Sequence, residues 1–197
     1  FYCIFFINAV FLSFIEQKSF SKEEGKNMKS IVMIIAHEGF RDEELLVPKR
    51  IFQENGISVK VASTNLETAS GMLGAKIKPD ILLKDIKVEN FDAVVFVGGI
   101  GASCFWQDSL AHTIAKSAYD QGKVVSAICI APVTLAKAGL LKNKKATVWE
   151  SEAEQLKKTQ AIYTKKPVER DGKIITASGP TAAEEFAREI LKALEEN

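Results

Sequence analysis

Short, continuous runs of apolar residues alternate with longer amphipathic stretches from about residue 30 onward. The apolar runs are SIVMIIA (30–36), VKVA (59–62), AVVFV (93–97), VVSAIC (124–129), ATVW (146–149) and KIITA (173–177). Because polar residues do not alternate within them, these runs are typical of strands that are buried on both faces. They predict a mostly parallel β-sheet that is covered by helices.

The amphipathic stretches between these runs predict the covering helices. They span about 41–55, 107–121, 130–138, 150–158 and 181–195. Gly56, Gly122 and Gly139 follow three of them, and glycine is the usual residue just past a helix end. Asp171-Gly172 predicts a hairpin, and the irregular segment 65–90 predicts a small hairpin or an excursion beside the main sheet. The alternation as a whole predicts an α/β domain of the doubly wound type.

Composition narrows the class of protein further. The chain has 197 residues, 47% of them hydrophobic, and a formal net charge of +1, with no basic stripe. This balance disfavours nucleic-acid binding. The three cysteines are odd in number and form no CxxC pair, which favours a reducing, cytoplasmic location over a disulfide scaffold. The two scattered histidines disfavour a metal site, and no motif suggests a cofactor.

The first 27 residues differ from the rest of the chain. FYCIFFINAVFLSFI (1–15) is strongly apolar, and a polar stretch follows it. The run is short for a membrane span, and it lacks the basic start of a signal peptide. We expect residues 1–27 to be a mis-called start or a dispensable extension, and residues 28–197 to form the single domain. The alternative is an anchor or a partner-binding helix, and membrane contact is expected only if residues 1–15 are retained.

The loops that follow the predicted strands contain the candidate chemistry, because ligands bind at the carboxyl ends of the strands in such sheets. HEGFRDEEL (37–45) follows the first strand, GGIGASC (98–104) the third, and Cys129 ends the next. Cys129 lies between Ala127 and Ala131, the small residues that a nucleophile elbow requires. A following helix would place positive charge and N–H groups beside the sulfur and favour its thiolate. The alternative is a buried structural cysteine that ends a strand.

A cysteine nucleophile needs a partner that exchanges protons with it. His37 is the histidine in a strand-end loop, whereas His112 falls within a helix and is interpreted as a surface or packing residue. Glu44 precedes an apolar stretch, so its carboxyl could stay protonated and donate to a thiolate. The alternative for Glu44 is a solvated helix start, which is the interpretation favoured for Asp42 and Glu43.

Four stretches resemble the ThiJ/PfpI superfamily, which includes intracellular cysteine proteases and deglycase-like proteins, over about residues 29–194. They are FRDEELLVPKRIFQENG (40–56), AVVFVGGIGA (93–102), GKVVSAICIAPVTLAKAGLLKNKKATVW (122–149) and DGKIITASGPTAAEEFAREIL (171–191). The resemblance implies a flavodoxin-like, three-layer sandwich that assembles as a homo-oligomer, commonly a dimer.

The resemblance also implies roles for particular residues. Cys129 matches the family's elbow nucleophile, Glu44 matches the acid that hydrogen-bonds it, and the N–H groups of Gly99 and Ile130 match the oxyanion pocket. The protease branch has histidine directly after the nucleophile, where this chain has Ile130. Other members have histidine where this chain has Trp149.

The missing histidines weaken the peptidase hypothesis, since a leaving amine needs an acid to protonate it. The favoured hypothesis is therefore a cysteine-dependent, cofactor-free enzyme that acts on small 2-oxoaldehydes or their protein adducts, with His37 as a possible assistant. A cysteine peptidase of the same family, with a histidine such as His112 supplied by a neighbouring subunit, is the second hypothesis. A redox sensor or chaperone that uses the oxidisable Cys129, with Cys104 as a resolving thiol, is the third.

Overall fold

The fold is taken from a computed structural model that describes residues 28–196. The predicted extension 1–27, and Cys3 with it, lies outside the described residues. None of the described helices has the length and apolar character that a bilayer crossing requires.

A seven-stranded sheet forms the centre of the domain, in the order β11-β12-β8-β7-β1-β3-β6. Its strands are β1 (Ser30–Ile34), β3 (Ser58–Ser63), β6 (Ile81–Leu82), β7 (Ala93–Phe96), β8 (Val124–Ile128), β11 (Val168–Asp171) and β12 (Ile174–Ala177). All neighbouring pairs are parallel except β11 and β12, which form the hairpin predicted from Asp171-Gly172. The prediction of a mostly parallel sheet is confirmed.

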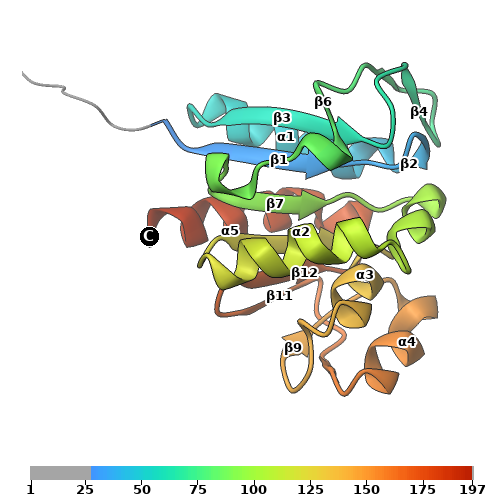
Figure 1. The fold of residues 1–197 in the computed structure, drawn as a ribbon. Helices are drawn as coiled ribbons and strands as arrows, with labels where there is room; N and C mark the ends of the chain where they lie inside the picture. The colour runs from blue at the N-terminus through green and yellow to red at the C-terminus, as the bar shows by residue number, and fades with distance from the viewer. Residues whose placement is uncertain (1–27, 197) are drawn as a thin grey trace, which may run out of the picture.

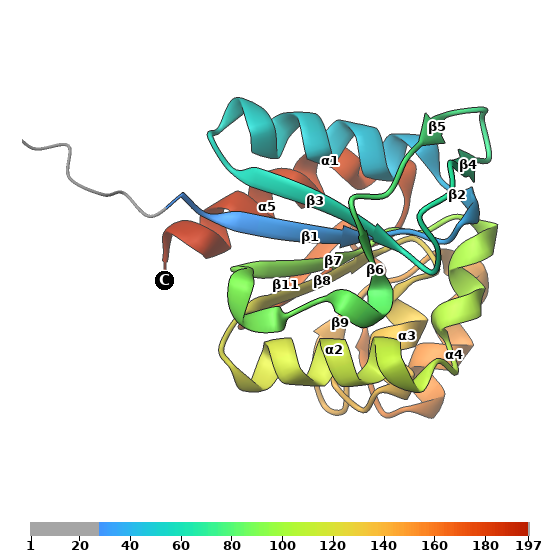
Figure 2. The same ribbon diagram turned by 45° about the horizontal axis from the view of Figure 1, so that its top comes forward.

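Helices cover both faces of this sheet (Figures 1 and 2). One face packs against α1 (Asp42–Glu54) and α5 (Ala183–Glu195), and the other against α2 (Ser109–Asp120) and α3 (Pro132–Lys137), while α4 (Ala153–Lys158) packs against α3 and β10. Each strand sends alternate side chains to opposite faces, so the apolar runs fill two separate cores. Val32 and Val94 belong to one core, and Ile31 and Val95 to the other. The three-layer sandwich is therefore confirmed.

Short 3-10 helices complete the connections between these elements. They are η1 (Leu83–Asp85), η2 (Val88–Asn90), η3 (Ile100–Phe105), η4 (Glu150–Glu152) and η5 (Pro180–Ala182).

Two parts of the predicted pattern differ from the structure. ATVW (146–149) is not a strand of the main sheet: β9 (Lys145–Ala146) pairs only with β10 (Ile162–Tyr163). The N–H groups that follow β9 bond elsewhere, from Thr147 to the Thr176 hydroxyl and from Trp149 to the Cys129 carbonyl. The sequence pattern also missed β2 (Glu38–Phe40), which pairs with β4 (Ala69–Gly71).

The irregular segment 65–90 contains the predicted excursion. β4 and β5 (Lys76–Ile77) form an antiparallel hairpin that joins β2 in a separate small sheet. Figure 1 shows this sheet beyond the carboxyl end of β1.

The chain order of the strands determines where the loops converge. From β1 the chain passes to β3 on one side and later to β7 on the other side. The carboxyl ends of β1 and β7 therefore flank a topological switch point, which is where open α/β sheets bind ligands. The segments that contain Glu44, Gly99 and Cys129 all begin at this edge.

Candidate active site

Cys129 lies in the turn between β8 and α3 and has a left-handed backbone, with φ of 63°. This conformation costs an L-residue roughly 1–2 kcal/mol, so the surrounding structure must hold it in place. The Cys129 N–H donates to the Ala177 carbonyl at 2.9 Å, which extends the pairing of β8 with β12. Ala127 and Ala131, the small neighbours on which the prediction rested, are both buried. The strand-turn-helix geometry is that of a nucleophile elbow.

Glu44 lies in the first turn of α1 and is completely buried. Its Oε2 accepts a hydrogen bond from the Gly98 N–H at 3.0 Å. Its Oε1 is also buried and has no partner of strict hydrogen-bonding geometry. The Cys129 thiol is close enough to form a side-chain hydrogen bond that affects the pKa of both groups. The structure therefore brings the carboxyl and the sulfur together, as predicted.

Gly98 and Gly99 allow this close approach. A Cβ atom on Gly98 would collide with Glu44 Oε2 and would lie 2.5 Å from the Cys129 Cβ. Gly99 has φ of 97°, and a Cβ there would collide with the backbone that leads into α1. The Arg41 N–H donates to the Gly98 carbonyl at 3.0 Å and joins the two loops. Side chains are thus excluded at both positions by the contacts that assemble the site.

The backbone N–H groups of Gly99 and Ile130 both act on the Cys129 thiol and lower its pKa. These are the two donors predicted for the oxyanion pocket, and they come from separate loops. Backbone N–H groups placed beside a nucleophile in this way are the kind of donors that stabilise an oxyanion.

The electrostatics of the pair differ from the prediction. Burial raises the pKa of Glu44 to about 7, although hydrogen bonds from Cys129 and Gly98 oppose this effect. Burial, followed by the negative charge of Glu44, raises the pKa of Cys129 to about 12, and the N–H groups of Gly99 and Ile130 act in the opposite direction. Burial and the Glu44 charge therefore act against the predicted thiolate, whereas the N–H groups of Gly99 and Ile130 act toward it. The charge of Glu44 no longer raises the pKa of Cys129 once that carboxyl is protonated. The protonation states of the two groups are therefore coupled.

Arg41 is a charged neighbour that the sequence analysis missed. Its Nε and Nη2 donate to the Glu43 carboxylate at 2.8 and 3.0 Å, and this pairing raises the pKa of Arg41. Its positive charge also acts on Glu44, where it lowers the carboxyl pKa. The sequence did offer a signal for this residue, because Arg41 is the one basic side chain in HEGFRDEEL (37–45) apart from His37.

A cavity of about 230 Å³ opens beside the sulfur. It is lined by Arg41, Glu44, Met72, Gly99, Ile100, Cys129, Ile130, Trp149 and Pro180. Most of these side chains are apolar, and they come from loops that follow several different strands. The polar groups of the lining are the Glu44 carboxyl, the Cys129 thiol, the Arg41 guanidinium and backbone N–H groups.

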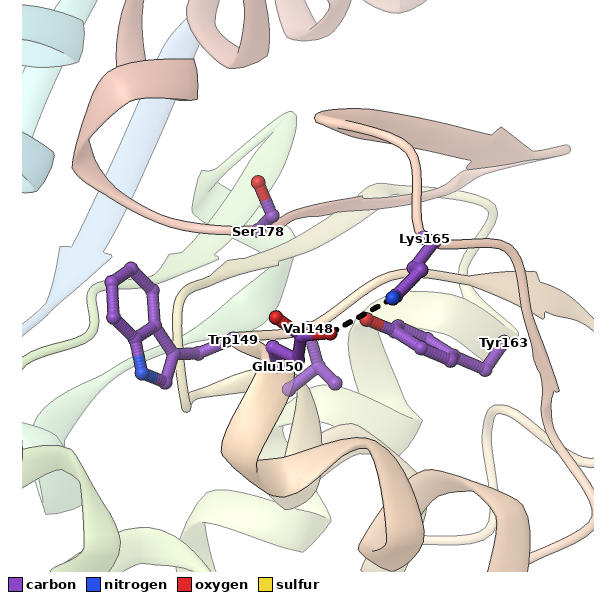
Figure 3. Close-up of a pocket in the computed structure, with 6 residues that line it drawn as sticks. All are labelled: Val148, Trp149, Glu150, Tyr163, Lys165 and Ser178. Carbon is purple, nitrogen blue, oxygen red and sulfur yellow. Dashed lines mark ion pairs between the residues drawn. The ribbon is translucent and has the colours of Figure 1, made fainter.

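A second hollow, of about 290 Å³, shares Trp149 with the first. Figure 3 shows Val148, Trp149, Glu150, Tyr163, Lys165 and Ser178 around it. Lys165 and Glu150 form an ion pair of 2.8 Å there, and the indole of Trp149 points away from Lys165. Both partners of this pair are largely exposed.

The two histidines lie apart from this cavity. His37 follows β1 but does not line the cavity, and its Nε2 is 3.7 Å from Glu38 Oε1. The structure therefore does not place it as an assistant to Cys129. His112 lies in α2, where its Nε2 hydrogen-bonds the Trp106 carbonyl at 3.1 Å, which confirms a packing role within this chain.

The other polar candidates have structural positions. Asp42 was interpreted as solvated, and this is wrong: it is buried, and its oxygens accept from the N–H groups of Leu73 and Ala75 at 2.9 and 2.7 Å. These two hydrogen bonds hold the turn of the β4–β5 hairpin against the start of α1. Cys104 lies exposed on η3 and does not line the cavity. Within residues 28–196, no group of three or more potential ligand side chains could hold a metal ion.

Relatives with curated descriptions match most of the chain. An uncharacterized protein of Methanocaldococcus jannaschii is 46% identical, covering 90% of this chain and 89% of its own length. A deglycase of Thermococcus kodakarensis is 30% identical, covering 83% and 98%. A glutathione-independent glyoxalase of Caenorhabditis elegans is 28% identical, covering 85% and 89%.

The fold and the family are supported independently. The crystal structure of a ThiJ/PfpI domain protein from Brachyspira murdochii superposes with a TM-score of 0.84 at 33% identity, covering 86% of this chain and 98% of the other. The model of the DJ-1/PfpI family matches residues 29–193, which is nearly the whole described domain. The chain therefore belongs to the DJ-1/PfpI family.

Proposed function

We propose that this protein is a cysteine-dependent enzyme that converts small 2-oxoaldehydes, free or as protein adducts, to 2-hydroxy acids. The observation that carries the proposal is the convergence of a thiol, a carboxyl of raised pKa and two N–H donors on one cavity. Named deglycase and glyoxalase relatives support enzymatic activity of this kind. The catalytic roles of Cys129 and Glu44 are part of this proposal.

The first step joins the sulfur to the aldehyde carbon. Because the pKa of Glu44 is about 7, part of this carboxyl is ionised at neutral pH and can accept the thiol proton. As the proton leaves, the Cys129 sulfur bonds to the aldehyde carbon and the carbonyl π electrons move to oxygen. The N–H groups of Gly99 and Ile130 stabilise this oxyanion, which then takes up a proton to give a hemithioacetal.

The second step moves a proton between the two carbons. A carboxylate at residue 44 removes the C–H proton of the hemithioacetal, the electron pair forms a carbon–carbon double bond, and the former ketone oxygen takes up a proton from the Glu44 carboxyl to give an enediol. The carbon bonded to sulfur then becomes a carbonyl as the Glu44 carboxylate takes its hydroxyl proton, and return of a proton to the former ketone carbon gives a 2-hydroxy thioester of Cys129. Water then cleaves the carbon–sulfur bond, releases the 2-hydroxy acid and restores the thiol. No oxidant or reductant is consumed, because one carbon is oxidised as its neighbour is reduced.

The peptidase hypothesis receives less support from the site. A peptide bond requires an acid that protonates the leaving amine, and the chain's own His37 does not line the cavity, so a peptidase would need a histidine from a neighbouring subunit. The redox-sensor hypothesis requires an accessible thiolate, and burial, which raises the pKa of Cys129, acts against this form. The homo-oligomer that the family resemblance implies stays a prediction.

The test is turnover of methylglyoxal by the purified chain, followed as loss of aldehyde and formation of lactate. We expect Cys129→Ser to reduce turnover to background, because its hydroxyl is a poor nucleophile. Cys104→Ser is the matched control, since this exposed thiol lies outside the cavity and its loss should leave turnover intact. Absence of turnover by the folded wild type, or full activity of Cys129→Ser, would refute the proposal.

A further inference from the structure

The cavity beside Cys129 has more room than a three-carbon aldehyde needs. Its volume of about 230 Å³ is many times the space that one water molecule requires. Methylglyoxal presents one methyl group beyond its two carbonyl carbons, so it would leave much of the apolar wall uncovered. The size and lining of the cavity therefore bear on which aldehydes bind well.

Trp149 is the aromatic part of that wall, and its position is fixed from two sides. Its N–H donates to the Cys129 carbonyl at 2.8 Å, so the backbone of the indole-bearing residue is tied to the elbow itself. A Cβ on Gly179 would lie 2.7 and 2.8 Å from two carbons of the indole ring. Only glycine at position 179 leaves room for the ring in this place. The indole is thus held beside the site by its backbone hydrogen bond to Cys129 and by the packing of its ring against Gly179.

The rim of the cavity exposes apolar surface that a ligand could bury. Trp149 is 47% exposed and Ile100 is 69% exposed, whereas Ala102 and Phe105 of the same 3-10 helix are buried. Burial of apolar surface contributes about 25 cal/mol per Å², and a ring stacked on the indole gains more. Arg41, the cation of this wall, already donates two hydrogen bonds to Glu43. The uncommitted surface is therefore apolar, which favours an apolar rather than an anionic substituent.

We propose that Trp149 is a specificity-determining residue that selects 2-oxoaldehydes whose ketone carries an aromatic or bulky apolar group over methylglyoxal. This inference rests on the proposed function and adds the substrate class. In it, the aldehyde carbon lies at the sulfur of Cys129, and the substituent of the ketone covers the indole.

The test compares phenylglyoxal with methylglyoxal as substrates of the full chain, using initial rates. The measured quantity is the ratio of their kcat/KM values, because the change in this ratio between variants cancels the intrinsic reactivity of each aldehyde. We expect Trp149→Ala to lower the ratio about tenfold, in line with the loss of one apolar contact in a specificity pocket. Trp149→Phe, which retains an aromatic face, should keep the ratio within about threefold of wild type.

Two further variants make the result decisive. Leu110→Ala removes an exposed apolar side chain of α2 that lines neither hollow, so it should not change the ratio. Trp149→Leu replaces the alanine variant if that one does not fold, and it should also lower the ratio. An unchanged ratio in a folded alanine or leucine variant overturns the inference while leaving the proposed function in place. No turnover of either aldehyde by the folded wild type overturns both.

Discussion

Replacement of Glu44 by glutamine is expected to stabilise the protein at high pH while it removes activity. Glu44 is completely buried, and burial raises its pKa from an ordinary 4.5 to about 7. The folded state therefore retains a proton that the unfolded chain has already lost above pH 4.5. The stability that this carboxyl contributes is fully present below pH 4.5 and is lost as the pH rises through 7.

The magnitude follows from the same two values. At about 1.4 kcal/mol per pH unit, a rise from 4.5 to about 7 corresponds to roughly 3 kcal/mol of unfolding free energy. Glutamine has nearly the same shape, its oxygen can accept the Gly98 N–H, and it never ionises. The difference between Glu44→Gln and wild type should therefore be near zero at pH 4.5 and about 3 kcal/mol in favour of the variant at pH 8.

Urea unfolding at pH 4.5, 6 and 8 measures this difference, because all other titrating groups cancel between the two proteins. Glu43→Gln is the matched control: its carboxylate is partly exposed and paired with Arg41, so it should show no such gain at pH 8. A difference that is independent of pH, or a wild type more stable than Glu44→Gln at pH 8, would falsify the assignment of Glu44 as a buried acid of raised pKa.

Three further predictions concern the neighbouring groups. Alkylation of Cys129 by iodoacetamide should still accelerate at pH 10 without a plateau, because burial and Glu44 raise its pKa to about 12, and Glu44→Gln should shift the curve to lower pH; a plateau near pH 8 would contradict this. Gly98→Ala should destabilise the fold by roughly 1–3 kcal/mol and reduce turnover at least tenfold, as measured by thermal unfolding and initial rates, since its Cβ has no space. Asp42→Ala should cost roughly 2–3 kcal/mol and speed hydrogen exchange of the 73 and 75 amides, and unchanged exchange would contradict the role given to this carboxylate.

The sequence pattern predicted the main sheet because its strands are buried on both faces. A run such as AVVFV (93–97) has no polar alternation, and β7 within it is completely buried. The same signal failed for ATVW (146–149), where apolar residues are buried outside the sheet. It also missed β2, since three residues of the type Glu-Gly-Phe carry no periodicity. A local run of apolar residues thus predicts burial. It does not predict which strand pairs with the run, because the partner comes from a distant part of the chain.

The position of the site could be predicted, but its electrostatics could not. Cys129 and Glu44 follow different strands, and the rule that strand ends converge was enough to bring them together. The degree of burial was not predictable, because it depends on side chains such as Met72 and Trp149 that arrive from elsewhere in the chain. For the same reason the sequence suggested that Asp42 is solvated, although the β4–β5 turn covers it.

Gly98 touches both reactive side chains, and those side chains belong to segments more than thirty residues away on either side of it. A chain that has been synthesised through Cys129 but has not yet folded would therefore lack the assembled site. The proposed activity would begin only when the loops of Gly98 and Cys129 pack against the start of α1. Measured turnover would therefore report that the tertiary structure is complete.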